Sequence, residues 1–131
     1  MHRENLGPRR AASISPLAAA VRLGLPFTLH QDTPVIAPNM LESIWCAVNR
    51  ISRNGGVLGP EYRISAYEAL KAVTVHAAWQ YALEGERGSL APGKTADLVL
   101  LDRDPTAVEP MAIRDIRVLE TIREGETLYR A

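Results

Sequence analysis

The sequence predicts an α/β chain that is helical up to about residue 84 and forms β-strands after that point. Two segments of the first part carry helix-capping patterns that are followed by apolar residues at helical spacing. The last third instead holds a compact apolar run, Leu98–Leu101, and a hairpin pattern between Val118 and Tyr129. This change of pattern divides the chain into a helical part and a β part.

The chain begins with polar residues that are interrupted by Gly7-Pro8, so we expect an irregular lead-in over the first dozen residues. A short helix should follow over residues 17–23. Ser15 suits its N-cap and Pro16 its first position, where the missing N–H of proline costs nothing.

The next segment, Pro26–His30, is typical of a buried strand and ends in a polar trio that continues with Gln31 and Asp32. Two prolines then predict a loop over residues 33–38, since proline cannot donate to a β-ladder. A lone strand leaves both of its hydrogen-bonding edges open. The first part of the chain is therefore expected to be a piece of a larger fold.

Two helices with capping boxes should follow the loop. Asn39 caps the first, with Glu42 three residues later, and Ser65 caps the second, with Glu68 in the same relation. We expect the second helix to continue without interruption to about Leu83. The first helix carries an apolar stripe with the spacing i, i+3, i+4 and i+7, formed by Leu41, Ile44, Trp45 and Val48.

The charge balance argues against two classes of protein. The 131 residues include 15 Lys plus Arg and 15 Asp plus Glu, so the formal net charge is zero. A nucleic-acid binder needs a basic face, and so does an electrostatic membrane anchor. No apolar run reaches the roughly 18 residues of a membrane span. We therefore predict a soluble, cytoplasmic protein that binds neither nucleic acid nor membranes.

The residues suited to metal binding are few and scattered. Cys46 is the single cysteine, so an internal disulfide and a zinc cage of cysteines are both excluded. The three histidines, His2, His30 and His76, match no recognised ligand spacing. Taken alone, the residues define no complete active site.

The stretch Gly88–Thr95 satisfies the phosphate-loop pattern G-x-x-x-x-G-K-[ST]. That chemistry needs a strand before the loop and a helix after it, whose N-terminal amides bind phosphate. Here charged residues precede the loop and the predicted strand Leu98–Leu101 follows it. We therefore predict a Pro-Gly turn that enters a hairpin, and no nucleotide site.

Asp32 is the strongest candidate for a catalytic or metal-binding residue. A carboxylate at the carboxyl end of a barrel or open-sheet strand points into the mouth where ligands bind. His30 should share its face of the strand and is a candidate for binding substrate. An equally good interpretation is that Asp32 forms a turn before Thr33-Pro34, with His30 as a hydrogen-bonded structural residue.

Three stretches of the sequence carry a family resemblance. Residues 27–35 (FTLHQDTPV) are similar to a segment written F-x-x-H-S-D-x-P-V, and residues 65–78 to a helix written S-x-x-E-A-L…T-x-N-A-A. Residues 88–102 (GSLAPGKTADLVLLD) are similar to a hairpin written G-S-L-x-P-G-K-x-A-D-L-V-V-L-D. Together, over residues 6–129, they resemble the C-terminal third of metal-dependent amidohydrolases, in the branch that includes N-substituted formamide deformylases.

The resemblance implies a fold and an activity. Residues 1–84 would be the last strand and helices of a (β/α)8 metal-dependent hydrolase barrel, and residues 85–131 the C-terminal strands of a small β-sandwich (composite) domain. The complete enzyme would hydrolyse a non-peptide C–N bond, in a small-molecule amide or N-formyl compound, with water activated by a divalent metal, usually zinc. Asp32 would bind or face that metal and relay the proton of the attacking hydroxide.

The same resemblance indicates what the chain lacks. The family's other metal ligands have no counterpart in these residues, and a full barrel needs roughly 250 residues. Gln31 and His76 stand where serine and asparagine are usual. We therefore expect the isolated chain to bind no metal and to be inactive. The apolar stripes Leu41/Ile44/Trp45/Val48 and Leu70/Val73 would be left exposed by the missing barrel, so we also expect the chain to associate with itself or with a missing N-terminal barrel segment. The alternative is a non-catalytic, oligomeric binding or scaffold module.

Overall fold

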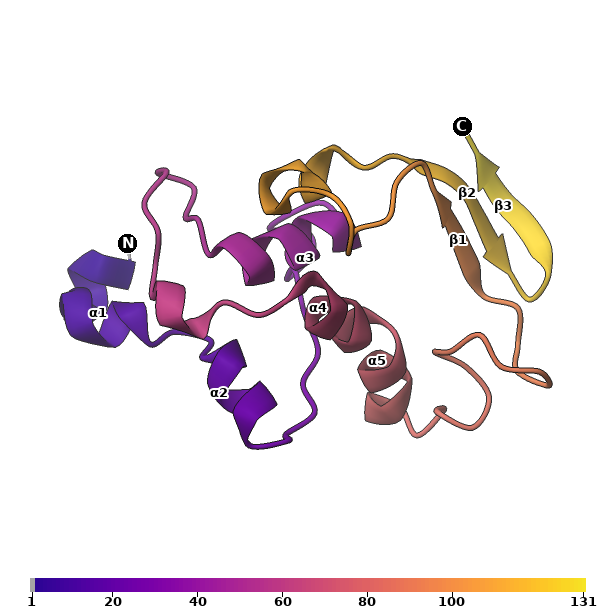
Figure 1. Ribbon diagram of the computed structural model, residues 1–131, viewed down its shortest axis with the longest axis horizontal. Coiled ribbons are helices and arrows are strands. Elements are labelled where there is room, and N and C mark those ends of the chain that lie inside the picture. Colours follow the sequence, from indigo (N-terminus) through magenta and orange to yellow (C-terminus); the bar gives the residue numbers. More distant parts are fainter. Residues whose placement is uncertain (1) are drawn as a thin grey trace.

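One helix, α3, lies at the centre of the helical part in this computed structural model, which describes residues 2–131 and the side chains from residue 4 onward (Figure 1). The three-stranded sheet extends away from the helices at the opposite end of the molecule from the N-terminus. The elements in chain order are α1 (His2–Ala12), α2 (Leu17–Arg22), α3 (Met40–Asn49), η1 (Pro60–Tyr62), α4 (Ala66–Val73), α5 (Val75–Gln80), β1 (Leu98–Leu101), η2 (Pro110–Asp115), β2 (Val118–Arg123) and β3 (Glu126–Arg130).

The apolar stripe predicted for α3 is present, but the expectation that it is left open by a missing barrel segment is wrong, because the stripe is buried within the chain as part of its core. All four of its members are buried, and Ile44 is only 2% exposed. Ala69 of α4 and Ile113 of η2 pack in the same cluster, so the core lies where α3 meets these two elements. The cap is confirmed too, because the Asn39 side chain accepts hydrogen bonds from the backbone N–H groups of Leu41 and Glu42.

The 3₁₀ helix η2 was not predicted from the sequence, yet it closes the core on the far side of α3. Trp45 Nε1 donates to the carbonyl of Met111 at 3.2 Å, and Asn49 Nδ2 donates to that of Pro110 at 2.9 Å. The Arg114 guanidinium lies 4.3 Å from the centre of the Trp45 ring. The helical and β parts of the chain are therefore connected through α3.

The prediction of one uninterrupted helix from Ser65 to Leu83 is wrong. Ser65 caps α4 as predicted, but the helix breaks at Thr74, whose φ and ψ are −126° and −92°. Its hydroxyl donates to the Leu70 carbonyl at 2.7 Å, in competition with the backbone ladder. Gly88 fits against this break, since a Cβ there would lie 2.7 Å from the Cβ of Ala78 and 3.0 Å from the Thr74 carbonyl oxygen.

The predicted irregular lead-in is also wrong, because α1 is helical on both sides of Gly7. Gly7 takes a left-handed φ of 73°, and Pro8 then suits the start of a second helical turn. Residue 1 lies outside the described residues. The body of α2 agrees with the prediction, but Ser15 is not its N-cap: Pro16 takes that place and no side chain caps the helix.

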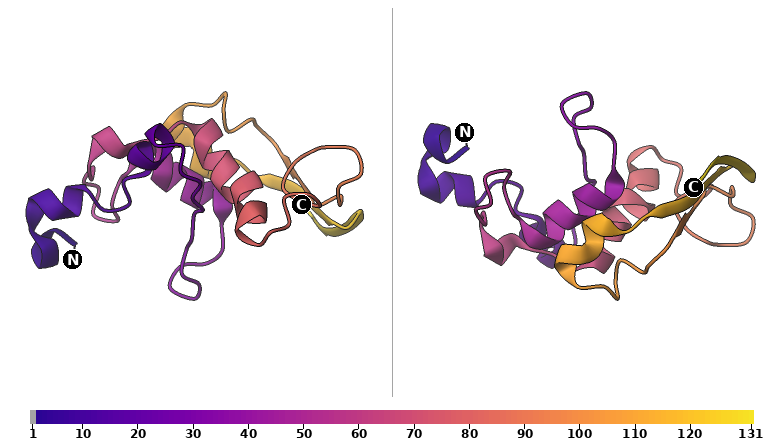
Figure 2. Two further views of the ribbon diagram at one scale, coloured as in Figure 1. Left: turned by 90° about the horizontal axis from the view of Figure 1, so that it is seen from below. Right: turned by 90° about the horizontal axis from the view of Figure 1, so that it is seen from above.

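The strand predicted at Pro26–His30 is not formed. Residues 25–32 belong to no strand or bridge, because the described part of the chain offers them no neighbouring strand. Figure 2 shows the loop between α2 and α3, in purple, projecting from the helical part of the molecule. The Phe27 carbonyl and the Thr28 hydroxyl of this segment are paired with side chains of α5 instead.

The β part of the chain agrees with the prediction. The strands β1, β2 and β3 form one antiparallel sheet in that order, and β2 and β3 are joined by a two-residue turn at Glu124 and Gly125. Both turn residues have positive φ, as a type I′ hairpin requires. The α/β class is thus confirmed in outline. The assignment of residues 1–84 to a barrel and 85–131 to a composite domain stays a prediction.

No helix among the residues described is both long enough and apolar enough to span a lipid bilayer.

Arg50, directly after α3, connects three segments of the chain. Its backbone is left-handed at φ 54°, and its guanidinium donates to the carbonyls of Ile14 at 2.6 Å, Ser15 at 2.8 Å and Leu58 at 2.6 Å. The same group lies 5.7 Å from the centre of the Tyr62 ring. Partial burial lowers the pKa of Arg50 from its ordinary value. These contacts fix the link between α1 and α2 against the end of α3.

Replacing Arg50 by lysine should destabilise the protein by about 2 kcal/mol, because one ammonium group cannot reproduce a planar fork of donors to several carbonyls. The free energy of unfolding in urea, followed by tryptophan fluorescence, measures the loss. Arg53→Lys in the adjacent exposed turn is the matched control and should cost much less. Equal losses in the two variants would contradict the role of Arg50.

The sheet should lose stability in acid before the helical core does. The backbone N–H of Glu124 and the Arg87 guanidinium lower the pKa of Asp97, and the side chain and backbone N–H of Arg117 lower that of Asp102. A carboxyl group with a lower pKa in the folded state than its unfolded value of about 3.9 stabilises the fold above that pH. This contribution is lost as the pH falls below about 4 and through the folded pKa.

Amide hydrogen exchange between pH 6 and pH 3 tests this order of unfolding. We expect β1 and β2 to lose protection at a higher pH than α3, and the acid sensitivity of the melting temperature to be smaller in Asp102→Asn. Glu109→Gln, a carboxylate that makes no capping bond to η2, is the control. Loss of protection in α3 and the sheet at the same pH would contradict the prediction.

Candidate functional site

Asp32 and His30, the two predicted site residues, lie together on the loop between α2 and α3. His30 Nε2 is 3.5 Å from Asp32 Oδ1, and the side chains are 78% and 79% exposed. The Asp32 backbone is left-handed at φ 56°, and its carbonyl accepts a hydrogen bond from the Val35 N–H at 2.8 Å. Aspartate tolerates this conformation well. Asp32 therefore forms a turn, as one of the two interpretations of the sequence expects, while its catalytic or metal-binding role stays a prediction.

The start of this segment is paired with α5. The ring of His76 donates through Nδ1 to the carbonyl of Phe27 at 3.1 Å, and the two rings meet edge to face with centroids 5.9 Å apart. One residue later, the Thr28 hydroxyl donates to Gln80 Oε1 at 2.6 Å. His76 therefore takes part in holding the segment that leads to Asp32, a role that the sequence analysis did not assign to it.

The end of the segment is paired with the start of α3 through Gln31. Its side-chain Nε2 donates to the Asn39 carbonyl, and its Oε1 accepts from the Asn39 N–H at 2.5 Å. In the sequence, Gln31 is distinguished only as a departure from the family's usual serine. Its position could have indicated this role, because Gln31 places a long amide side chain between the two candidate site residues His30 and Asp32.

Asp32 and His30 by themselves do not fit a zinc ion. Zinc sites use three or four protein ligands, with a water in the fourth position of catalytic sites. Within the described part of the chain, no group of three or more His, Cys, Asp or Glu side chains could hold a metal. Asp32 and His30 could together supply two ligands, and both side chains are largely exposed to water.

The loop with the phosphate-loop pattern has a different structure from a nucleotide site. Lys94 Nζ donates to the carbonyls of Glu84 and Arg87, the latter at 3.3 Å. The ammonium group therefore binds backbone oxygens of the residues just before the loop. Strand β1 follows the loop, in the position where a phosphate loop needs a helix. Gly88 is required by its contact with the break at Thr74.

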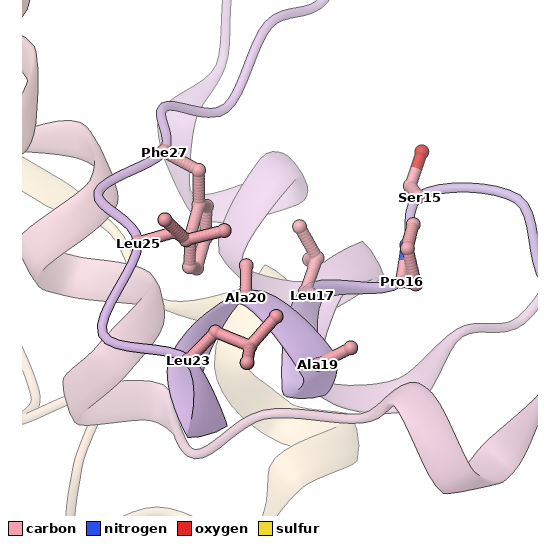
Figure 3. Close-up of a pocket in the computed structure, with 8 residues that line it drawn as sticks. All are labelled: Ser15, Pro16, Leu17, Ala19, Ala20, Leu23, Leu25 and Phe27. Carbon is pink, nitrogen blue, oxygen red and sulfur yellow. The ribbon is translucent and has the colours of Figure 1, made fainter.

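A hollow with a volume of about 310 Å³ lies beside α2 (Figure 3). Its lining is almost entirely apolar, and Leu23 and Leu25 within it are 72% and 54% exposed. Such a surface can pack against another apolar surface but offers no group for acid–base chemistry. The lining residues are Ser15, Pro16, Leu17, Ala19, Ala20, Leu23, Leu25 and Phe27.

Comparison with known proteins extends these observations. The sequence matches the amidohydrolase family over residues 1–129. It is 32% identical over 114 residues to an N-substituted formamide deformylase of Arthrobacter pascens. The aligned residues make up 87% of this chain and 21% of that protein. It is 27% identical to an imidazolonepropionase of Pseudomonas aeruginosa, over 92% of this chain and 28% of that protein. The chain thus spans between a fifth and three tenths of these two relatives.

Solved structures give the same result at the level of the fold. The crystal structure of an amidohydrolase from Thermotoga maritima superposes with a TM-score of 0.66 at 25% identity, over 88% of this chain and 26% of that one. Guanine deaminase of Escherichia coli superposes with a TM-score of 0.65 at 21% identity, over 92% and 33%. The family match spans nearly the whole sequence and includes the segment that carries His30 and Asp32, and the chain therefore belongs to the amidohydrolase family.

Proposed function

We propose that this chain is the C-terminal part of a metal-dependent amidohydrolase, a cytoplasmic enzyme that hydrolyses a non-peptide C–N bond in a small-molecule amide or N-formyl compound. The observation that carries the proposal is the continuous family match, which includes an exposed His30–Asp32 pair on a loop beside the core helix. One relative is named an N-substituted formamide deformylase, and another an adenine deaminase. Both names describe reactions at C–N bonds.

In this proposal, Asp32 is the chain's contribution to a divalent-metal centre, most simply zinc, and His30 contacts the substrate. The other ligands come from parts of the enzyme that this sequence does not contain. The support is the shortage of donors described above, since Asp32 and His30 alone cannot complete a zinc site. The isolated chain is therefore proposed to be inactive.

Exposed apolar side chains on the α2–α3 side support an association with further protein. Leu23, Leu25, Val35 and Ile36 are each at least half exposed. In the complete enzyme they would pack against the preceding barrel segment, and in isolation against a second copy of the chain.

The isolated chain should contain far less than one zinc ion per molecule, should be oligomeric, and should not hydrolyse an N-substituted formamide faster than buffer does. Elemental analysis, native mass spectrometry and a product assay on one sample measure these properties. Near-stoichiometric zinc together with hydrolysis that is lost in Asp32→Asn would show that the chain alone is the enzyme. A compact, metal-free monomer would contradict the proposed association.

The role of Asp32 can be tested in a chimera, in which this chain replaces the matching part of the Arthrobacter pascens deformylase. Asp32→Asn should lower kcat of the chimera by about 10²–10⁴-fold, the range for loss of a positioned acid–base group. It should also lower the bound metal, measured by elemental analysis. Glu109→Gln is the control and should change neither quantity. Unchanged metal content and kcat in Asp32→Asn would contradict the assignment.

A further inference from the structure

We propose that Gln31 is a positioning residue, whose side chain fixes the His30–Asp32 pair against helix α3. This inference rests on the proposed function for its catalytic meaning, while the structural step can be measured separately. We call the two hydrogen bonds between the Gln31 side chain and the Asn39 backbone the Gln31–Asn39 bridge.

The bridge reproduces the pairing that a neighbouring strand would provide. A side-chain amide has a carbonyl oxygen and an NH₂ group in one plane, and so can accept and donate as a peptide unit does. Gln31 uses both, so the N–H and the C=O of Asn39 are paired by a single side chain. The segment before it belongs to no sheet, and an amide side chain thus substitutes for a missing ladder.

The partner of Gln31 is well suited to fix a loop, because Asn39 is the N-cap of α3. The Asn39 side chain accepts from Leu41 and Glu42, and α3 forms the centre of the core. A capping box would have used Glu42 to pair the Asn39 N–H. Gln31 takes that donor instead, and Glu42 forms an ion pair with Arg114 at 3.1 Å.

The burial pattern around the bridge agrees with a positioning role. Gln31 is partly buried, whereas its two neighbours, His30 and Asp32, are exposed. Upstream, the side chain of Leu29 packs against the core cluster. Downstream, the hydrogen bonds of Asp32 and Thr33 are made within the loop itself, to Val35 and Ile36. The bridge therefore ties the chain to the start of α3 at the residue between the two outward-facing side chains.

Hydrogen exchange and ¹⁵N relaxation of the full chain test the bridge through two substitutions. Gln31→Ala removes both hydrogen bonds, and exchange of the Asn39 amide should rise about tenfold, while the order of the His30 and Asp32 amides falls. Gln31→Glu retains the acceptor for the Asn39 N–H, and exchange there should stay close to that of the parent. Gln80→Ala, which removes a bond to Thr28 on the same segment, is the control and should leave Asn39 exchange unchanged.

The proposal is overturned if Gln31→Ala leaves both the Asn39 exchange and the order at His30 and Asp32 as in the parent. It is also overturned if Gln31→Glu behaves as Gln31→Ala does. In the active chimera, Gln31→Ala should lower kcat more than it changes KM, with partial recovery in Gln31→Glu. A chimera that is inactive with Gln31 and Asp32 intact would count against the proposed function, while the exchange measurements would still decide the role of Gln31.

Discussion

The Arg50 guanidinium is the interaction on which the arrangement of the helical part depends. This region has no β-sheet to organise it, so the segments around α3 are joined by packing against the core and by hydrogen bonds from side chains to backbone carbonyls. Arg50 fixes the α1–α2 link and Leu58 at one end of α3. The position of that link sets the position of α2, and α2 sets where the segment that leads to Asp32 begins.

Features that depend on near neighbours could be predicted from the sequence. The caps at Asn39 and Ser65 are hydrogen bonds between residues two or three positions apart in the sequence. The apolar stripe of α3 lies within a single helix. Features that depend on distant residues could not be predicted. The break at Thr74 accommodates Gly88 from the next loop. The strand expected at Pro26–His30 required a neighbouring strand that the described part of the chain does not contain.

The candidate site divides in the same way. The proximity of His30 and Asp32 follows from their separation by one residue. Their functional interest followed from the place of Asp32 at the end of a predicted strand and from the family resemblance. The groups that hold their segment were missed because they are distant in the sequence. His76 lies 49 residues from its partner Phe27, and Asn39 lies 8 residues from Gln31. Neither contact has a periodic signature. Residues that support a site are thus harder to find in a sequence than residues that form it, since their identity is free to vary with the local geometry.

The packing of Gly88 bears on how short sequence patterns are interpreted. Two requirements select glycine there: a left-handed backbone at φ 83° and a contact in which even a methyl group would collide with α5. Neither has any connection with phosphate. Backbone conformation and steric volume can thus select a glycine at the first position of a nucleotide-binding signature for reasons unrelated to nucleotides. A search by pattern would count such a chain among nucleotide-binding proteins, and the flanking secondary structure is what corrects the error.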